Sequence, residues 1–179
     1  MSKIKITTPK GEFKWASVQG AGKKDLQGRD IFSVDIEMPY ERAQPLVDEI
    51  TALWESDKPK GAKDPKSTGF RIMDDGMTVK FTFKTSAVFP SGDPKEVTIF
   101  DAKAQRTKVT DKIGNGSVGR VSGMASIYDA GVAARGVTLY LDSLQLIKLV
   151  RYEEVASFDV EEGDDVFTSD ATFVAEDFA

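Results

Sequence analysis

Met77-Thr-Val-Lys-Phe-Thr-Phe-Lys-Thr85 alternates apolar and polar side chains along its length. Successive side chains of a β-strand point to opposite faces of the sheet, so the valine and both phenylalanines share one face, while Lys80 and Lys84 share the other. The segment therefore predicts a β-strand that buries its aromatic face in a core and presents its lysines to solvent.

Similar strand patterns flank this segment on both sides. They lie at 13–19, 30–38, 97–100, 117–128 and 136–149. In the strand at 117–128, Arg120 and Tyr128 share the face opposite the apolar one. Glycine-containing turns separate the strands: Gly114-Asn-Gly116 is expected to form a hairpin turn, and Asp129-Ala-Gly131 to join the last two strands.

The periodicity changes between Glu41 and Trp54. Apolar residues recur there at intervals that place them on one face of an α-helix; they are Ala43, Leu46, Val47, Ile50, Leu53 and Trp54. Pro45 fits this helix only within the first turn, where its missing N–H costs no hydrogen bond. About six strands, one helix and two basic loops, at 58–69 and 102–112, predict a mainly-β protein: a small β-barrel with one packed α-helix.

Charge divides the chain into two parts. It has 24 basic and 29 acidic residues, a net charge of −5, but residues 153–179 hold ten of the acids and none of the bases. The remaining 1–152 carries 24 basic against 19 acidic residues, a net charge of +5. We expect a basic folded domain over 1–152 and an acidic, flexible, disordered tail over 153–179.

The chain contains no cysteine and no histidine. Disulfides, thiolate nucleophiles, imidazole bases and nearly all zinc, haem and iron–sulfur sites are thereby excluded. Gly114-Asn-Gly-Ser-Val-Gly119 matches the dinucleotide fingerprint, but the pattern places no strand before it and no helix after it. We therefore expect no enzyme, no cofactor and no metal.

Apolar runs are short throughout the sequence. None approaches the roughly 18 residues of a membrane span, and the first residues lack the apolar region of a secretory signal. A cytoplasmic protein without membrane contact is expected.

Basic and aromatic residues share several predicted strands. Sequence-tolerant binding of single-stranded nucleic acid needs cations that track phosphates and rings on which bases stack. The candidates are Lys14, Trp15, Lys80, Lys84, Lys103, Arg106, Lys108, Arg120, Tyr128 and Tyr140. A simpler interpretation stays open, in which Phe81 and Phe83 belong to the core and the lysines only solvate the outer sheet.

Phenylalanines are spaced through the acidic tail. Acidic-hydrophobic alternation without basic residues is typical of a disordered segment that docks on basic partner proteins. The recruiting candidates are Phe158, Asp164, Asp165, Phe167, Phe173, Glu176, Asp177 and Phe178. A plain solvated terminus is the alternative. The opposite charges of tail and body also predict that the tail competes with DNA for the basic surface.

Three segments carry a resemblance to a known family: Ile99-Phe-Asp-Ala-Lys103, Ile113-Gly-Asn-Gly-Ser117 and Gly136-Val-Thr-Leu-Tyr-Leu-Asp-Ser-Leu-Gln-Leu-Ile-Lys-Leu-Val150. The chain resembles the bacteriophage single-stranded DNA-binding proteins, which have an OB-like core and an acidic C-terminus with phenylalanine. The resemblance implies an OB-like β-barrel that binds and protects single-stranded DNA during phage replication and recombination in the host bacterial cytoplasm. It also implies that the tail contacts replication proteins.

Other functions and partners stay open at this point. A strand-annealing recombination mediator would use the same chemistry, whereas a protein-interaction module would use the basic patch to bind an acidic partner. A virion component is a further alternative. Weak binding to duplex DNA and homo-oligomerisation are compatible with the pattern.

Overall fold

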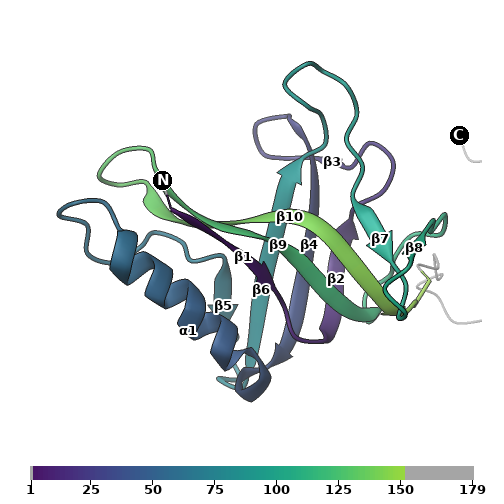
Figure 1. The fold of residues 1–179 in the computed structure, drawn as a ribbon, viewed down its shortest axis with the longest axis horizontal. Helices are drawn as coiled ribbons and strands as arrows, with labels where there is room; N and C mark the ends of the chain where they lie inside the picture. The colour runs from purple at the N-terminus through teal and green to yellow at the C-terminus, as the bar shows by residue number, and fades with distance from the viewer. Residues whose placement is uncertain (1, 152–179) are drawn as a thin grey trace, which may run out of the picture.

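The computed structural model describes residues 2–151, which form ten strands and one helix (Figure 1). The strands are β1 (Lys3–Thr7), β2 (Gly11–Ser17), β3 (Lys23–Lys24), β4 (Asp30–Pro39), β5 (Phe70–Ile72), β6 (Thr78–Ser86), β7 (Thr98–Phe100), β8 (Arg106–Thr107), β9 (Val118–Asp129) and β10 (Arg135–Lys148). The helix is α1 (Tyr40–Asp57). The expected tail, with all its recruiting candidates, lies outside the described residues.

Five of these strands close into a barrel. β2 pairs with β4, β4 with β6, β6 with β10, β10 with β9, and β9 returns to β2. The β6–β10 pairing is parallel, and the other four are antiparallel. This is the strand order of an OB-fold barrel. β1 extends the sheet beyond β9, and β7 and β8 extend it beyond β10. The mainly-β, OB-like prediction is therefore confirmed.

The described residues contain more strands than the six or so predicted. β3 and β8 have two residues each, so they arise from pairing with β4 and β7 rather than from a pattern of their own. The expected hairpin at Gly114–Gly116 is wrong, because β9 pairs with β1, β2 and β10 and not with β8. The turn docks on β2 instead, where the Gly116 N–H donates to the Phe13 carbonyl at 3.0 Å.

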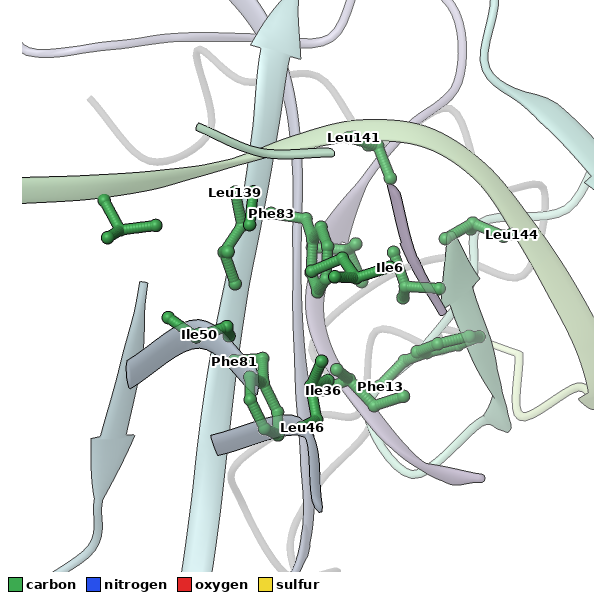
Figure 2. Packing of buried hydrophobic residues seen from close by; sticks show 14 of the residues in the cluster. Ile6, Phe13, Ile36, Leu46, Ile50, Phe81, Phe83, Leu139, Leu141 and Leu144 are labelled. Carbon is green, nitrogen blue, oxygen red and sulfur yellow. The ribbon is translucent and has the colours of Figure 1, made fainter. Parts of the chain in front are cut away.

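Helix α1 lies across one end of the barrel and contacts β1, β4, β6, β9 and β10 (Figure 1). All six apolar positions predicted for its inner face are buried. Figure 2 shows Leu46 and Ile50 of the helix beside Ile36 and Phe81 of the sheet. No helix among residues 2–151 has the length and apolar character needed to span a membrane.

The expected position of Pro45 in the first helical turn is wrong. The helix begins at Tyr40, because the Tyr40 N–H donates to the Met77 carbonyl at 2.7 Å directly after β4 ends. Pro45 is therefore the sixth helical residue, and its missing N–H leaves the Glu41 carbonyl without the usual helical donor.

The core lies between the barrel strands and the helix. Phe81 and Phe83 of β6 are fully buried, as their alternation predicted, and Phe13 of β2 is equally buried. Two inward-facing glycines of β9 let β10 approach closely. A Cβ atom at Gly123 would overlap the Tyr140 carbonyl oxygen, and one at Gly119 would overlap that of Gln145.

Candidate nucleic-acid interface

The barrel closes along a seam, the parallel pairing of β6 with β10, and this seam brings together two of the predicted binding residues. Lys84 of β6 and Tyr140 of β10 are register partners, and both are exposed, Tyr140 by 48%. Register partners project from the same face of a sheet. Lys84 also faces Ser33 of β4, and Tyr140 faces Met124 of β9. One row of side chains on the outer face of the sheet therefore crosses four strands, with Ser33 buried within it.

A second row lies beside the first. Ile31 of β4 is two residues from Ser33 and so shares its face; its register partners are Ser86 of β6 and Lys23 of β3. We call the two rows together the seam face: Lys23, Ile31, Ser33, Lys84, Ser86, Met124 and Tyr140. It contains two lysines and no acidic residue.

The predicted lysines on neighbouring rows have carboxylate partners. The Lys80 ammonium lies 3.9 Å from Asp35, and the Lys14 ammonium lies 3.8 Å from Glu12. Within residues 2–151, by contrast, Lys23 and Lys84 form no ion pair. The two lysines of the seam face are therefore less compensated than the lysines of these neighbouring rows.

Trp15 stands at the β2 end of the seam face. It is 70% exposed with a φ of 51°, at an irregularity of β2 that turns the ring outward. Its backbone N–H donates to the Asn115 side-chain oxygen at 2.8 Å, which braces this strained conformation. The ring lines a cavity of about 590 Å³ together with Lys23, Lys112 and Arg151. Trp15 is therefore not a core residue.

A separate basic group surrounds β7 and β8. One register row runs from Arg120 of β9 through Gln145 and Phe100 to Arg106 of β8. The Gln145 amide donates to the carbonyls of residues 101 and 102, at 3.3 Å each. A cavity of about 250 Å³ opens here, lined by Phe100, Gln145 and Arg120 among others. We call Phe100, Lys103, Arg106, Lys108, Arg120 and Gln145 the β7–β8 cluster.

The sequence analysis did not assign a role to Lys23, Phe100 or Gln145. Phe100 lies in the Ile99–Lys103 segment that carried the family resemblance, so a signal was present there. Lys23 belongs to the seam face only because β3 pairs with β4, and Gln145 belongs to the β7–β8 cluster only because β10 pairs with β9. Local sequence patterns do not show such pairings.

Tyr128 lies apart from both groups. Its register partner is Gly136, and a Cβ atom there would lie 2.9 Å from the Tyr128 hydroxyl, so the ring lies across the glycine. The loop at 58–69 is attached nearby, where the Lys66 N–H donates to the Arg135 carbonyl at 2.7 Å. The loop at 102–112 is attached at Gln145, roughly 30 Å further along β10. The two basic loops thus lie at opposite ends of the molecule (Figure 1) and form no single patch.

The β2–β4 loop beside the seam face is held by Asp25. Its carboxylate accepts hydrogen bonds from the backbone N–H groups of Gln27 and Arg29, at 2.9 Å each. The backbone hydrogen bond from Arg29 is the main reason that the pKa of Asp25 lies below its ordinary value. Among the described residues, no group of acidic side chains is arranged to hold a metal ion.

Solved structures of known proteins share this fold. The single-stranded DNA-binding protein gp2.5 of bacteriophage T7 superposes with a TM-score of 0.67 at 24% sequence identity, over 93% of this chain and 100% of that one. The single-stranded DNA-binding protein of bacteriophage Enc34, in complex with single-stranded DNA, gives 0.59 at 12% identity, over 84% and 88%. A C-terminally truncated form of the Enc34 protein also gives 0.59, at 14% identity over 80% and 85%. No protein-family model and no curated protein sequence matches the chain. The resemblance to phage single-stranded DNA-binding proteins is confirmed at the level of the fold.

Proposed function

We propose that the seam face binds single-stranded DNA without strong sequence preference. The observation that carries this proposal is the pairing of Lys84 with Tyr140, which sets an uncompensated cation beside a half-exposed ring. A phosphate can bind the ammonium while a neighbouring base stacks on the ring, and such stacking tolerates any base because every base has a π-face. Trp15 supplies a second ring beside Lys23.

The position of the seam face in the barrel supports the same proposal. OB-folds bind oligonucleotides on the face of their second and third strands and on the loop between the first two. In this barrel those strands are β4 and β6, and the loop is 18–29. The seam face covers the ends of β4 and β6 that lie nearest this loop.

The remaining predicted residues extend this surface in our proposal. The β7–β8 cluster, with Lys103, Arg106, Lys108 and Arg120 unpaired within residues 2–151, continues the phosphate path along β10. Lys14 and Lys80 are secondary contacts, because carboxylates already neutralise them. Tyr128 offers a ring at the far end of the same strand pair.

The biological role we infer is protection of single strands during phage DNA replication and recombination in the host bacterial cytoplasm. Binding requires no bond to be made or broken. The acidic tail then recruits replication proteins and competes with DNA for the basic surface, because its charge is −10 against +5 on the body.

Fluorescence anisotropy tests the proposal directly. Labelled oligo(dT) and a duplex of equal length should be titrated with the full chain, and the single strand should bind more tightly. For single strands, log K falls with log salt by about 0.7 per phosphate contact, so several contacts give a steep line. Equal binding to both, or a flat salt response, contradicts the proposal and favours a protein-interaction module.

A further inference from the structure

A cavity of about 510 Å³ opens at the end of the barrel opposite helix α1. Phe32, which lines it, is the third residue of β4, whereas α1 follows the last residue of that strand. The mouths of β-barrels are common ligand sites. We call this space the mouth cavity. Four of its lining residues are apolar and no more than 9% exposed, and we call them its floor: Val18, Phe32, Val97 and Ile99.

The charged residues around the mouth cavity are mostly basic. Three cations and one carboxylate line it, on Lys95, Arg106, Lys108 and Glu96. Within residues 2–151, none of the four forms an ion pair. The Gln19 side-chain amide at the cavity wall is already engaged, because it donates to the carbonyls of Val109 and Asp111. The cavity therefore suits an apolar group that is flanked by negative charge.

The acidic tail begins beside this cavity. Val109 lines the cavity, and the carboxylate of Asp111, two positions later, accepts from the Arg151 side chain at 3.0 Å. Phe158 is the first phenylalanine beyond Arg151, seven positions further on. Seven residues span at most roughly 25 Å, whereas Val109 and Asp111 are no more than roughly 7 Å apart, so Phe158 can reach the cavity of its own chain. Five acids surround it in the sequence: Glu153, Glu154, Asp159, Glu161 and Glu162.

We propose that the mouth cavity is the docking site of Phe158 of the same chain, with the neighbouring acids facing Arg106 and Lys108. A phenylalanine ring suits the floor because its burial requires no hydrogen bond. A nucleobase would bring polar edges that four apolar side chains cannot satisfy. The short connection to Arg151 also gives Phe158 a higher local concentration at the cavity than the later phenylalanines have.

This inference goes beyond the proposed competition between tail and DNA. That competition depends on the charge of the tail, whereas docking depends on one ring. The mouth cavity shares Arg106 and Lys108 with the β7–β8 cluster and has no residue in common with the seam face. Docking therefore covers the end of the proposed phosphate path and leaves the pairing of Lys84 with Tyr140 open.

Disulfide trapping in the full chain tests the docking, because the chain contains no cysteine of its own. Ser157→Cys lies next to Phe158, and Thr107→Cys lies in the lining of the mouth cavity. The matched pair combines Ser157→Cys with Ser86→Cys on the seam face. In oxidised glutathione at high dilution, the pair at 157 and 107 should form its intramolecular disulfide about 10- to 100-fold faster, the factor that burial of a phenylalanine ring provides.

Two further substitutions in the pair at 157 and 107 show whether the ring is responsible. Phe158→Ala should remove most of the advantage over the matched pair, although it keeps every charge. Phe173→Ala deletes a later ring and should leave the advantage intact. Equal rates for the two cysteine pairs, or no effect of Phe158→Ala, would contradict the docking.

Alkylation of Thr107→Cys alone reports which group occupies the cavity. Iodoacetamide should react more slowly with this variant than with the same variant carrying Phe158→Ala, because the docked ring covers the cavity. In the Phe158→Ala chain, oligo(dT) and an abasic oligonucleotide of equal length should change the rate equally. Protection by oligo(dT) alone would assign the cavity to a nucleobase and overturn the inference. The trapping is measured without DNA, so its outcome is independent of the proposed DNA binding.

Discussion

Tyr140 and Lys84 form the register pair through which β10 joins β6 and closes the barrel. The two side chains proposed to bind DNA therefore lie at the β6–β10 pairing that closes the barrel. Their relative position is fixed by backbone pairing rather than by a loop, which keeps the ring and the ammonium side by side before DNA arrives.

Replacing the unpaired lysines should weaken binding more than replacing the paired ones. Lys23→Ala with Lys84→Ala should reduce affinity for oligo(dT) and make the salt slope shallower by about 1.4, since each lost phosphate contact contributes about 0.7. The matched double variant, Lys14→Ala with Lys80→Ala, removes two lysines that already have carboxylate partners and should change the slope less. Anisotropy across a salt series measures both. Equal slopes in the two variants would mean that the seam face has no special role.

The two tryptophans differ enough in exposure to act as separate reporters. Trp15 is 70% exposed and Trp54 only 2% exposed, so iodide should quench emission from Trp15 alone. Oligo(dT) should reduce that quenching by covering the ring, and Trp15→Leu should cost roughly 1–3 kcal/mol of binding free energy. Should Trp15→Leu lower the melting temperature and leave the affinity unchanged, the ring has a structural role instead.

An added methyl group at Gly123 should destabilise the fold. The Cβ atom would overlap the Tyr140 carbonyl oxygen, so β10 would have to move away from β9. We expect Gly123→Ala to lower the free energy of unfolding by about 1–3 kcal/mol, measured by urea denaturation. Ser122→Ala, at the adjacent outward position, is the control and should change stability far less. Equal stability of the two variants would show that β9 and β10 are not packed this closely.

The turn between β9 and β10 should contribute stability that depends on pH. Hydrogen bonds from the Arg135 side chain and then from the Gly131 N–H hold the pKa of Asp129 below its ordinary value. A lowered carboxyl pKa stabilises the fold above the pKa of the unfolded chain, and this contribution disappears as pH falls through the lower, folded pKa. The difference in unfolding free energy between the unaltered chain and Asp129→Asn should therefore be constant above about pH 5 and shrink in more acidic solution.

Arg135→Gln provides the control for that titration, because it removes the main donor to Asp129. In an Arg135→Gln background, Asp129→Asn should therefore show little of this pH-dependent difference in unfolding free energy. A difference that stays constant down to pH 3 would contradict the assignment.

Removing the tail after Tyr152 should tighten DNA binding, most strongly at low salt. The deleted segment carries −10, and its competition works only near contact because the screening length at physiological salt is about 8 Å. A matched full-length variant replaces the tail phenylalanines with alanine and keeps every charge; the positions are Phe158, Phe167, Phe173 and Phe178. It should still show competition with DNA and should lose partner recruitment, measured by pull-down of replication proteins. Unchanged affinity of the truncated chain at low salt would remove the competing role.

Regular patterns in the sequence were enough to predict the central elements. The alternation in β6 and the helical spacing in α1 each predicted which side chains are buried, because burial of a whole face requires that period. Arg120 and Tyr128 also lie on the predicted outer face of β9. Each of these features is determined by the sequence of a single strand or helix.

Features that depend on pairing between distant segments could not be predicted. Nothing near Lys84 shows that Tyr140 lies beside it, and nothing near Lys80 shows that Asp35 neutralises it. The outward turn of Trp15 depends on a hydrogen bond to Asn115, a hundred positions away. The division of the basic residues into the seam face and the β7–β8 cluster follows from this long-range register.

The pairing of β2 with β9 has a consequence for how the chain folds as it is synthesised. Gly11 and Gly119 are register partners 108 positions apart, and Phe13 beside them is fully buried. The ribosome must therefore release β9 before the barrel can close, and β10 before its parallel seam can form. Until then the apolar faces of β2, β4 and β6 remain open on one side, so the nascent chain exposes aromatic surface to chaperones for most of its translation.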